Sequence, residues 1–222
     1  MDNKILIIGL IFTMLGCKTK YINDKRRTMN EAFEKFDIEE YRNKNLRAKS
    51  DEHPNDFMTK GGTRIIRVGS EQTGYYEEQI LPMPSFCKIQ KEFYISGSIR
   101  EKGLMFGNAS VGENTLKIGK WYYFTEQGTL DKVVDEDKKF GKFSYDQLLD
   151  LIDKEGLISI HSGKNRENFH ADFEINVSGK KLWKVKVNTE YLADVYTKGW
   201  NYQIDGNTGE IITKSKFTDT YN

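Results

Sequence analysis

Residues 116–130 read LKIGKWYYFTEQGTL, and this stretch decides the fold class. A run of β-branched and aromatic residues ends at Phe124, a turn with Gly128 follows, and Leu130 starts a second extended run. Aromatic and β-branched side chains suit a pleated sheet, and glycine supplies the positive φ of a tight hairpin turn. Residues 93–99 (FYISGSI) have the same order of aromatics, turn glycine and returning strand. The two copies predict consecutive antiparallel hairpins.

Similar extended runs continue on both sides of this stretch, separated by Gly, Pro or Asn. Aromatic residues make up 13% of the chain and there are only three prolines, a composition that favours strands. We therefore expect an antiparallel meander across residues 63–140. Its predicted strands are residues 63–68, 74–81, 88–95, 98–106 and 116–124.

The pattern Gly119-Lys120-Trp121-Tyr122-Tyr123-Phe124-x-x-x-Gly128-x-Leu130 resembles the hairpin of MORN-type repeats. Such hairpins occur in proteins labelled as toxin-antitoxin components and in many uncharacterised lipoproteins of the Bacteroidetes group. The resemblance covers one full copy and one partial copy that lacks the tryptophan. It implies a stacking scaffold of hairpins and says little about function.

A helix is predicted after the meander. Ser144-x-x-Gln147 has the spacing of a capping box, and the apolar residues that follow recur at helical spacing. Gly156 stands where a helix commonly ends in a left-handed residue. Further strands are then expected at residues 157–161, 171–177, 181–188, 200–204 and 210–214.

The last hairpin, Trp200-x-Tyr202-x-Ile204-Asp205-Gly206-Asn207-Thr208-Gly209-Glu210-Ile211-Ile212, resembles the end of PepSY-type domains. Together with the helix and the strand of Trp183, it assigns residues 141–222 to a PepSY-like unit. Modules of this type are small α/β folds outside the cytoplasm, some linked to peptidase inhibition, so the resemblance implies a binding or regulatory role. The expected fold class is α+β and β-dominated: a hairpin meander followed by a small PepSY-like α/β unit.

The N-terminal sequence predicts where in the cell the protein is located. Ile5 to Leu15 form an apolar run of the length found in signal peptides, about 7–15 residues, and shorter than the roughly 17–25 of a membrane-spanning helix. Met14-Leu15-Gly16-Cys17 resembles a lipobox, whose cysteine is diacylated and becomes the first mature residue. We predict a lipoprotein signal peptide at residues 1–16 and lipidation at Cys17. The alternatives are an ordinary secretory signal and an uncleaved anchor.

The predicted location is therefore the cell envelope, on an extracytoplasmic membrane face to which the protein binds through acylated Cys17. The outer membrane is favoured, and the inner membrane is the alternative. Residues 17–28 are rich in lysine and arginine and read as a basic tether. In residues 29–62 we expect a short helix at 29–42 and then a polar loop, because Thr28-x-x-Glu31 has capping-box spacing.

Charge and cysteine content bear on two further properties, nucleic-acid binding and disulfide formation. Lys plus Arg number 34 and Asp plus Glu 33, so the net charge of +1 does not indicate a nucleic-acid partner. With Cys17 acylated, Cys87 is the only other cysteine and no intrachain disulfide can form. We expect Cys87 to be a buried small hydrophobic residue.

No motif of catalysis, metal binding or cofactor binding is present. His53 lies in a polar loop, and the spacing of His161 and His170 fits neither a helical zinc pair nor a CxxC framework. Asp205-x-Asn207-x-x-Glu210 lacks the remaining ligands of a calcium loop. We expect Asp205 to bind nearby backbone N–H groups of a turn, and we assign no catalytic residue, metal or cofactor.

Six aromatic residues on predicted strands are candidate partner-binding residues. Neighbours on a strand point to opposite faces, so part of the aromatic run in the MORN-like hairpin must face away from its local core. The alternative is that these side chains form the contact between the two β units. They are Trp121, Tyr122, Tyr123, Trp183, Trp200 and Tyr202.

These observations favour a non-catalytic binding or interaction protein anchored to the membrane. One specific version is an immunity or inhibitor protein that blocks a secreted toxin or peptidase. The alternative is an envelope hydrolase or glycan-handling component with an unrecognised site. That alternative predicts a concave pocket that holds at least two of His161, His170, Asp172 and Glu174. A purely structural role is a third hypothesis.

Overall fold

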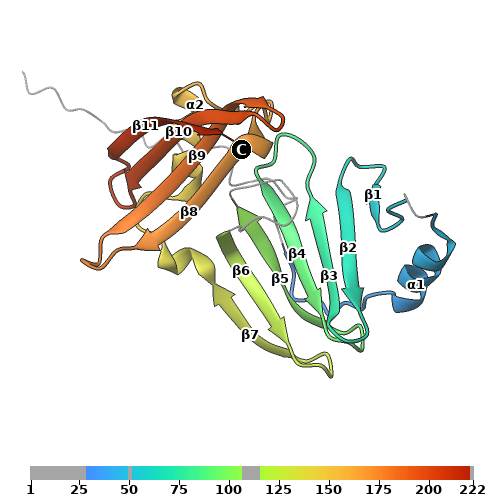
Figure 1. Ribbon diagram of the computed structural model, residues 1–222. Coiled ribbons are helices and arrows are strands. Elements are labelled where there is room, and N and C mark those ends of the chain that lie inside the picture. Colours follow the sequence, from blue (N-terminus) through green and yellow to red (C-terminus); the bar gives the residue numbers. More distant parts are fainter. Residues whose placement is uncertain (1–28, 50–51, 107–115, 221–222) are drawn as a thin grey trace, which may run out of the picture.

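A computed structural model describes residues 29–49, 52–106 and 116–220 of the chain. It contains two antiparallel sheets of seven and four strands, so the fold is β-dominated, as predicted. Figure 1 shows the larger sheet as a fan coloured from blue-green to yellow-green and the smaller sheet in orange and red beside it. The predicted signal peptide, Cys17 and the basic tether 17–28 lie outside the described residues.

The large sheet is a meander in which each strand pairs with the next one along the chain. All five strands predicted in this region are present, and the run from Leu130 forms a further strand, β7. The short edge strand β1 was missed, because it lies in the predicted polar loop. The strands are β1 (Asp56–Met58), β2 (Arg64–Ser70), β3 (Gly74–Ile80), β4 (Cys87–Phe93), β5 (Ile99–Phe106), β6 (Leu116–Phe124) and β7 (Leu130–Asp135).

The two hairpin turns that repeat in the sequence also repeat in the structure. Gly97 and Gly128 have φ of 79° and 89°, which glycine adopts without steric cost. Each donates its N–H to the carbonyl three residues earlier, at 2.9 Å in both turns. The internal repeat therefore predicted two equivalent turns correctly.

Residues 29–37 form an extended segment, here called the strap, and the predicted helix at 29–42 is wrong there. The strap joins the turn between β4 and β5, because Phe36 donates its N–H to Gly97 at 2.8 Å and Ile99 donates to Glu34 at 3.0 Å. Helix α1 (Ile38–Arg47) begins only after Asp37, whose side chain accepts a hydrogen bond from the Glu40 N–H. Contacts with the sheet outweigh the local helical pattern.

Helix α2 (Tyr145–Lys154) confirms the predicted capping box. The Ser144 side chain accepts from the Gln147 N–H, and the Gln147 side chain accepts from the Ser144 N–H. Gly156 has the left-handed conformation expected after the helix, with φ of 75°. The apolar face of the helix is buried through Leu148, Leu149 and Ile152.

The small sheet has the strand order β11-β10-β9-β8. Four of the five strands predicted after α2 are present, but residues 157–161 form no strand. That segment makes a single antiparallel bridge between Ser159 and Lys164, and Asn165, directly after it, has a left-handed φ of 62°. The strands are β8 (Phe169–Ile175), β9 (Lys181–Leu192), β10 (Tyr196–Asp205) and β11 (Ile211–Thr220), and two 3-10 helices are η3 (Glu136–Lys139) and η4 (Arg166–Asn168).

One hydrophobic core joins the two sheets and α2. It contains side chains of β4, β5 and β6 from the large sheet and of β8, β9 and β10 from the small sheet. Arg166 adds a polar contact, since its Nη1 donates to the carbonyls of Leu81 at 2.7 Å and Ser85 at 3.1 Å. The sequence boundary predicted at residue 140 therefore runs through a shared core. Cys87 lies in that core and is buried, as expected.

Across the described residues, no helix combines the length and the apolar character needed to cross a membrane.

Candidate functional site

Most of the predicted partner-binding aromatics are core residues. Trp121 is fully buried, and its indole N–H donates to the carbonyl of Leu104 at 3.1 Å. Tyr122 is also buried, with its hydroxyl donating to the carbonyl of Met29 at 3.3 Å. In the run 121–123, only Tyr123 keeps partial exposure.

The candidate aromatics of the small sheet also divide into buried and partly exposed side chains. Trp183 is fully buried, stacks on Phe140 at 5.0 Å and donates its indole N–H to the Phe143 carbonyl at 3.0 Å. Tyr202 is buried and donates its hydroxyl to Glu155 at 3.0 Å; burial and this bond raise the pKa of Tyr202 to about 12. Of the six candidates, Tyr123 and Trp200 retain partial exposure, and four belong to the interior.

The histidines are dispersed, but His170 lines the same depression as Asp172, one of the carboxylates named for the hydrolase alternative. His170 and Asp172 lie two residues apart on β8 and line the same depression. Glu174 is on the same strand and forms an ion pair with Lys184, which also lines it. His161 is exposed in the turn before β8 and is not among the lining residues.

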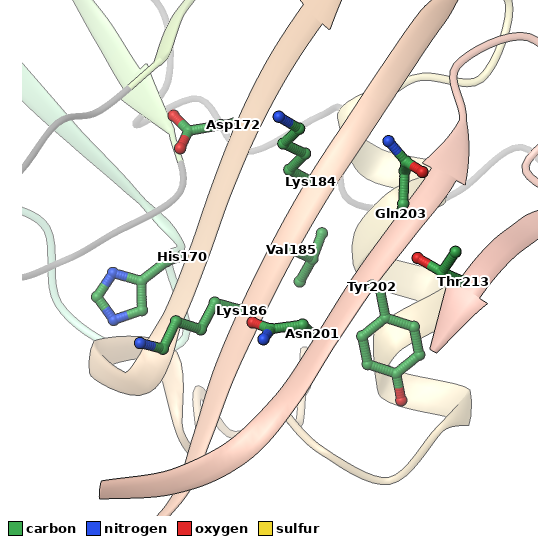
Figure 2. Close-up of a pocket in the computed structure, with 9 residues that line it drawn as sticks. All are labelled: His170, Asp172, Lys184, Val185, Lys186, Asn201, Tyr202, Gln203 and Thr213. Atoms are coloured by element: carbon green, nitrogen blue, oxygen red, sulfur yellow. The ribbon is translucent and has the colours of Figure 1, made fainter. Parts of the chain in front are cut away.

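This depression lies on the side of the small sheet that faces away from the core, here called the outer face (Figure 2). Its volume is about 360 Å³. The strand register places its side chains in two rows across the sheet. One row is His170, Lys186 and Asn201, and the other is Asp172, Lys184, Gln203 and Thr213.

The lysines of the outer face are already neutralised. Lys184 Nζ lies 2.7 Å from a carboxylate oxygen of Glu174, and Lys186 Nζ lies 2.9 Å from one of Asp219. Lys186 also lies over the ring of Phe217, 4.3 Å from its centre. The outer face therefore carries charges of both signs and no excess of positive charge.

Four other polar side chains of the outer face are uncommitted. Within the part of the chain that the structure describes, no hydrogen bond or ion pair involves the side chain of Asp172, Asn201, Gln203 or Thr213. Figure 2 shows Asp172, Gln203 and Thr213 on three different strands, and the carboxylate of Asp172 does not point toward His170. These groups can bind a ligand without first breaking an internal bond.

A second depression, of about 250 Å³, lies between α1 and β2. Asn55 lines it and is buried, and its side-chain nitrogen donates to Asn45 at 2.7 Å. The side-chain oxygen of Asn55 has no partner among the described residues. This isolated amide is a weaker candidate than the two rows of the outer face.

The Asp205 turn is confirmed as a hydrogen-bonded turn. Its carboxylate accepts from the N–H groups of Asn207 at 2.8 Å and Thr208 at 3.0 Å. These bonds, with Lys180, lower the pKa of Asp205 to about 2. In residues 29–49, 52–106 and 116–220, no three His, Cys, Asp or Glu side chains gather as metal ligands.

No protein-family model matches the chain, and no curated protein or solved structure matches it significantly.

The sequence indicated only part of this site. It named His170 and Asp172, but not the residues beside them on the neighbouring strands. Lys184 and Lys186 alternate with Trp183, Val185 and Val187, so their outward direction could be read from the sequence. The order of the strands in the sheet and their register could not be read from the sequence.

Proposed function

We propose that this chain is a lipid-anchored binding protein of the cell envelope, which holds its ligand on the outer face of the small sheet without converting it. The observation that carries the proposal is the set of four uncommitted polar side chains on one regular sheet face. The strands fix the backbone positions of these side chains, so binding has to order side-chain rotamers but no backbone segment. The lipobox-like sequence at Cys17 supports the envelope location.

Capture of envelope components by the full-length lipoprotein tests the binding role. We expect wild type to retain a component that the double variant Asn201→Ala/Gln203→Ala loses, and to release it chemically unchanged. Gln72→Ala and Gln127→Ala, exposed amides of the large sheet, serve as controls and should behave as wild type. Conversion of the captured component by wild type but not by Asp172→Asn would instead favour the alternative of an envelope hydrolase.

The anchor has its own test. Cys17→Ala should move the protein from the membrane fraction to the soluble fraction and abolish labelling by a radioactive fatty acid. Both changes follow from the loss of the thiol that carries the acyl chains. Unchanged membrane retention would show that another segment holds the protein.

A protein partner, such as a secreted toxin or peptidase, is a second candidate with its own supporting observation. The tip of the β9–β10 hairpin exposes three apolar side chains, with Tyr191 67%, Leu192 50% and Val195 47% exposed. Exposed apolar and aromatic groups are common anchors of protein interfaces. If this candidate holds, Leu192→Ser/Val195→Ser should abolish capture of a protein, and the outer-face variants should not.

A further inference from the structure

The uncommitted groups of the outer face define what a ligand must offer. A carboxylate such as Asp172 only accepts hydrogen bonds, whereas the amides of Asn201 and Gln203 and the hydroxyl of Thr213 both donate and accept. A complementary ligand must therefore donate and accept at closely spaced positions. A hydroxyl group does both at a single oxygen.

The charges of the outer face disfavour a polyanion. Glu174 and Asp219 already occupy the two lysines, and Asp172 adds an uncompensated negative charge. A chain of phosphate, sulfate or carboxylate groups would have to displace these carboxylates and approach Asp172. Like charges at such close range are mutually repulsive, so a ligand without charge fits better.

The dimensions of the outer face favour an elongated ligand. Asp172, Lys184, Gln203 and Thr213 stand on four neighbouring strands, and strand spacing gives the row a length of about 14 Å. The second row, with Asn201, lies about 7 Å away along the strands. A chain of linked rings laid across the strands would meet polar groups along its length.

Peptide and protein ligands fit this surface less well. The backbone groups of β9 and β10 are engaged in the sheet on both sides, so an extended peptide cannot pair with them. Phe217, at the end of the outer face, lies beneath Lys186, and the aromatic side chain that lines the depression, Tyr202, is buried. The residues that line the depression thus include none of the accessible aromatic anchors that dominate most protein interfaces.

Resting on the proposed function, we infer that the outer face binds a neutral, hydroxyl-rich chain: a glycan without sulfate, phosphate or carboxylate groups. Asp172 accepts from ligand hydroxyls, and Asn201, Gln203 and Thr213 exchange hydrogen bonds with them. Each contact is open to water and weak, so many copies anchored in one membrane would retain a long chain through avidity.

The test uses the full-length lipoprotein in detergent micelles and immobilised polysaccharides as probes. The neutral probes are a β-glucan, a xylan and a mannan, and the anionic probes are dextran sulfate and polygalacturonate. We expect at least one neutral probe to retain the protein and neither anionic probe to retain it. Retention should change little between about 0.05 and 0.5 M salt, because no net charge is neutralised on binding.

Variants then locate the binding. Gln203→Ala, Asn201→Ala and Asp172→Asn should each weaken retention about fivefold, the effect of losing one hydrogen bond. Gln72→Ala, an exposed glutamine of the large sheet, should leave retention unchanged. Thermal unfolding of each variant checks that its fold is intact.

The outcomes separate the inference from the proposed function. Retention only by anionic probes, or retention that the outer-face variants leave unchanged, overturns the glycan inference. So does a captured protein that depends on Asn201 and Gln203, although that result upholds a binding role for the outer face. If wild type and the outer-face variants capture the same envelope components, the proposed function itself fails.

Discussion

The strap side of the large sheet and the outer face of the small sheet both carry polar side chains across several strands. On the strap side these side chains bind one another, whereas several on the outer face do not. Lys102 has no exposed surface and donates to the carbonyl of Ala32 at 2.6 Å and to Glu34 at 2.7 Å. Glu34 also binds Lys91 at 2.5 Å. Asp172 and Gln203 on the outer face have no such partner among the described residues. The chain uses the polar groups on the strap side for its own stability and leaves those of the outer face available.

Glu34→Ala should have the largest effect on the free energy of unfolding, because it removes the carboxylate that binds both Lys102 and Lys91. The substitution leaves Lys102 buried without its carboxylate, and removing one partner of a buried pair costs about 3 kcal/mol. Urea unfolding measures the loss. Glu174→Ala is the matched control, since its partner Lys184 is half exposed, and should change stability by less than about 0.5 kcal/mol. Equal losses in the two variants would contradict the contrast between the faces.

Gly103→Ala should cost about 2 kcal/mol, the usual effect of overpacking a tight interior. A Cβ at this position would lie 2.3 Å from the indole ring of Trp121, which is fully buried. Thermal unfolding should show a lower midpoint for this variant. Gly61→Ala, where a Cβ would meet nothing closer than 3.9 Å, should unfold like wild type.

The strap should also make stability depend on acidity. Burial alone would raise the pKa of Glu34, but hydrogen bonds from Lys102 and Lys91 outweigh it and lower the pKa below its ordinary 4.5. The folded protein therefore keeps this stabilisation in full above pH 4.5 and loses it as the pH falls through the lower folded pKa.

Urea unfolding of wild type and Glu34→Gln across this range measures the acid dependence. Their difference in free energy of unfolding should be constant above pH 4.5 and shrink below it, by at most about 1.4 kcal/mol per pH unit. A difference that grows on acidification would show that Glu34 is not the group responsible.

Substitutions of the uncommitted side chains of the outer face should have the smallest effect on stability. Asn201→Ala and Gln203→Ala remove side chains that bond to none of the described residues, so the free energy of unfolding should change by less than about 0.5 kcal/mol. Chemical denaturation measures it. A loss above about 1 kcal/mol would mean that these amides have structural partners after all.

Local patterns predicted the hairpins and α2 well. The strand runs are bounded by turn residues, and Gly97, Gly128 and Gly156 all adopt the positive φ that their positions implied. The capping box at Ser144 was likewise a local signal, complete within four residues. Such elements are set by neighbours in sequence, which a single sequence displays.

The strap could not be predicted, because its partners are distant in sequence. Met29, Phe33 and Phe36 recur at spacings that suit a helix. Phe36 instead stacks on Tyr75 at 4.6 Å, and Glu34 reaches Lys102 on β5. The same limit applies to the candidate site. Asn201 and Lys186 become neighbours only through the register of β9 and β10.

The strap also bears on the order in which the large sheet forms. Glu34 and Lys102 are separated by 68 residues, and the bond from Tyr122 to Met29 spans 93. Closing loops of this length carries an entropic cost that must be met before the contacts stabilise anything. The strap is made early but cannot dock until β5 and β6 have been synthesised. We expect its docking to be a late step of folding, after which the Lys102 ammonium group loses its contact with water.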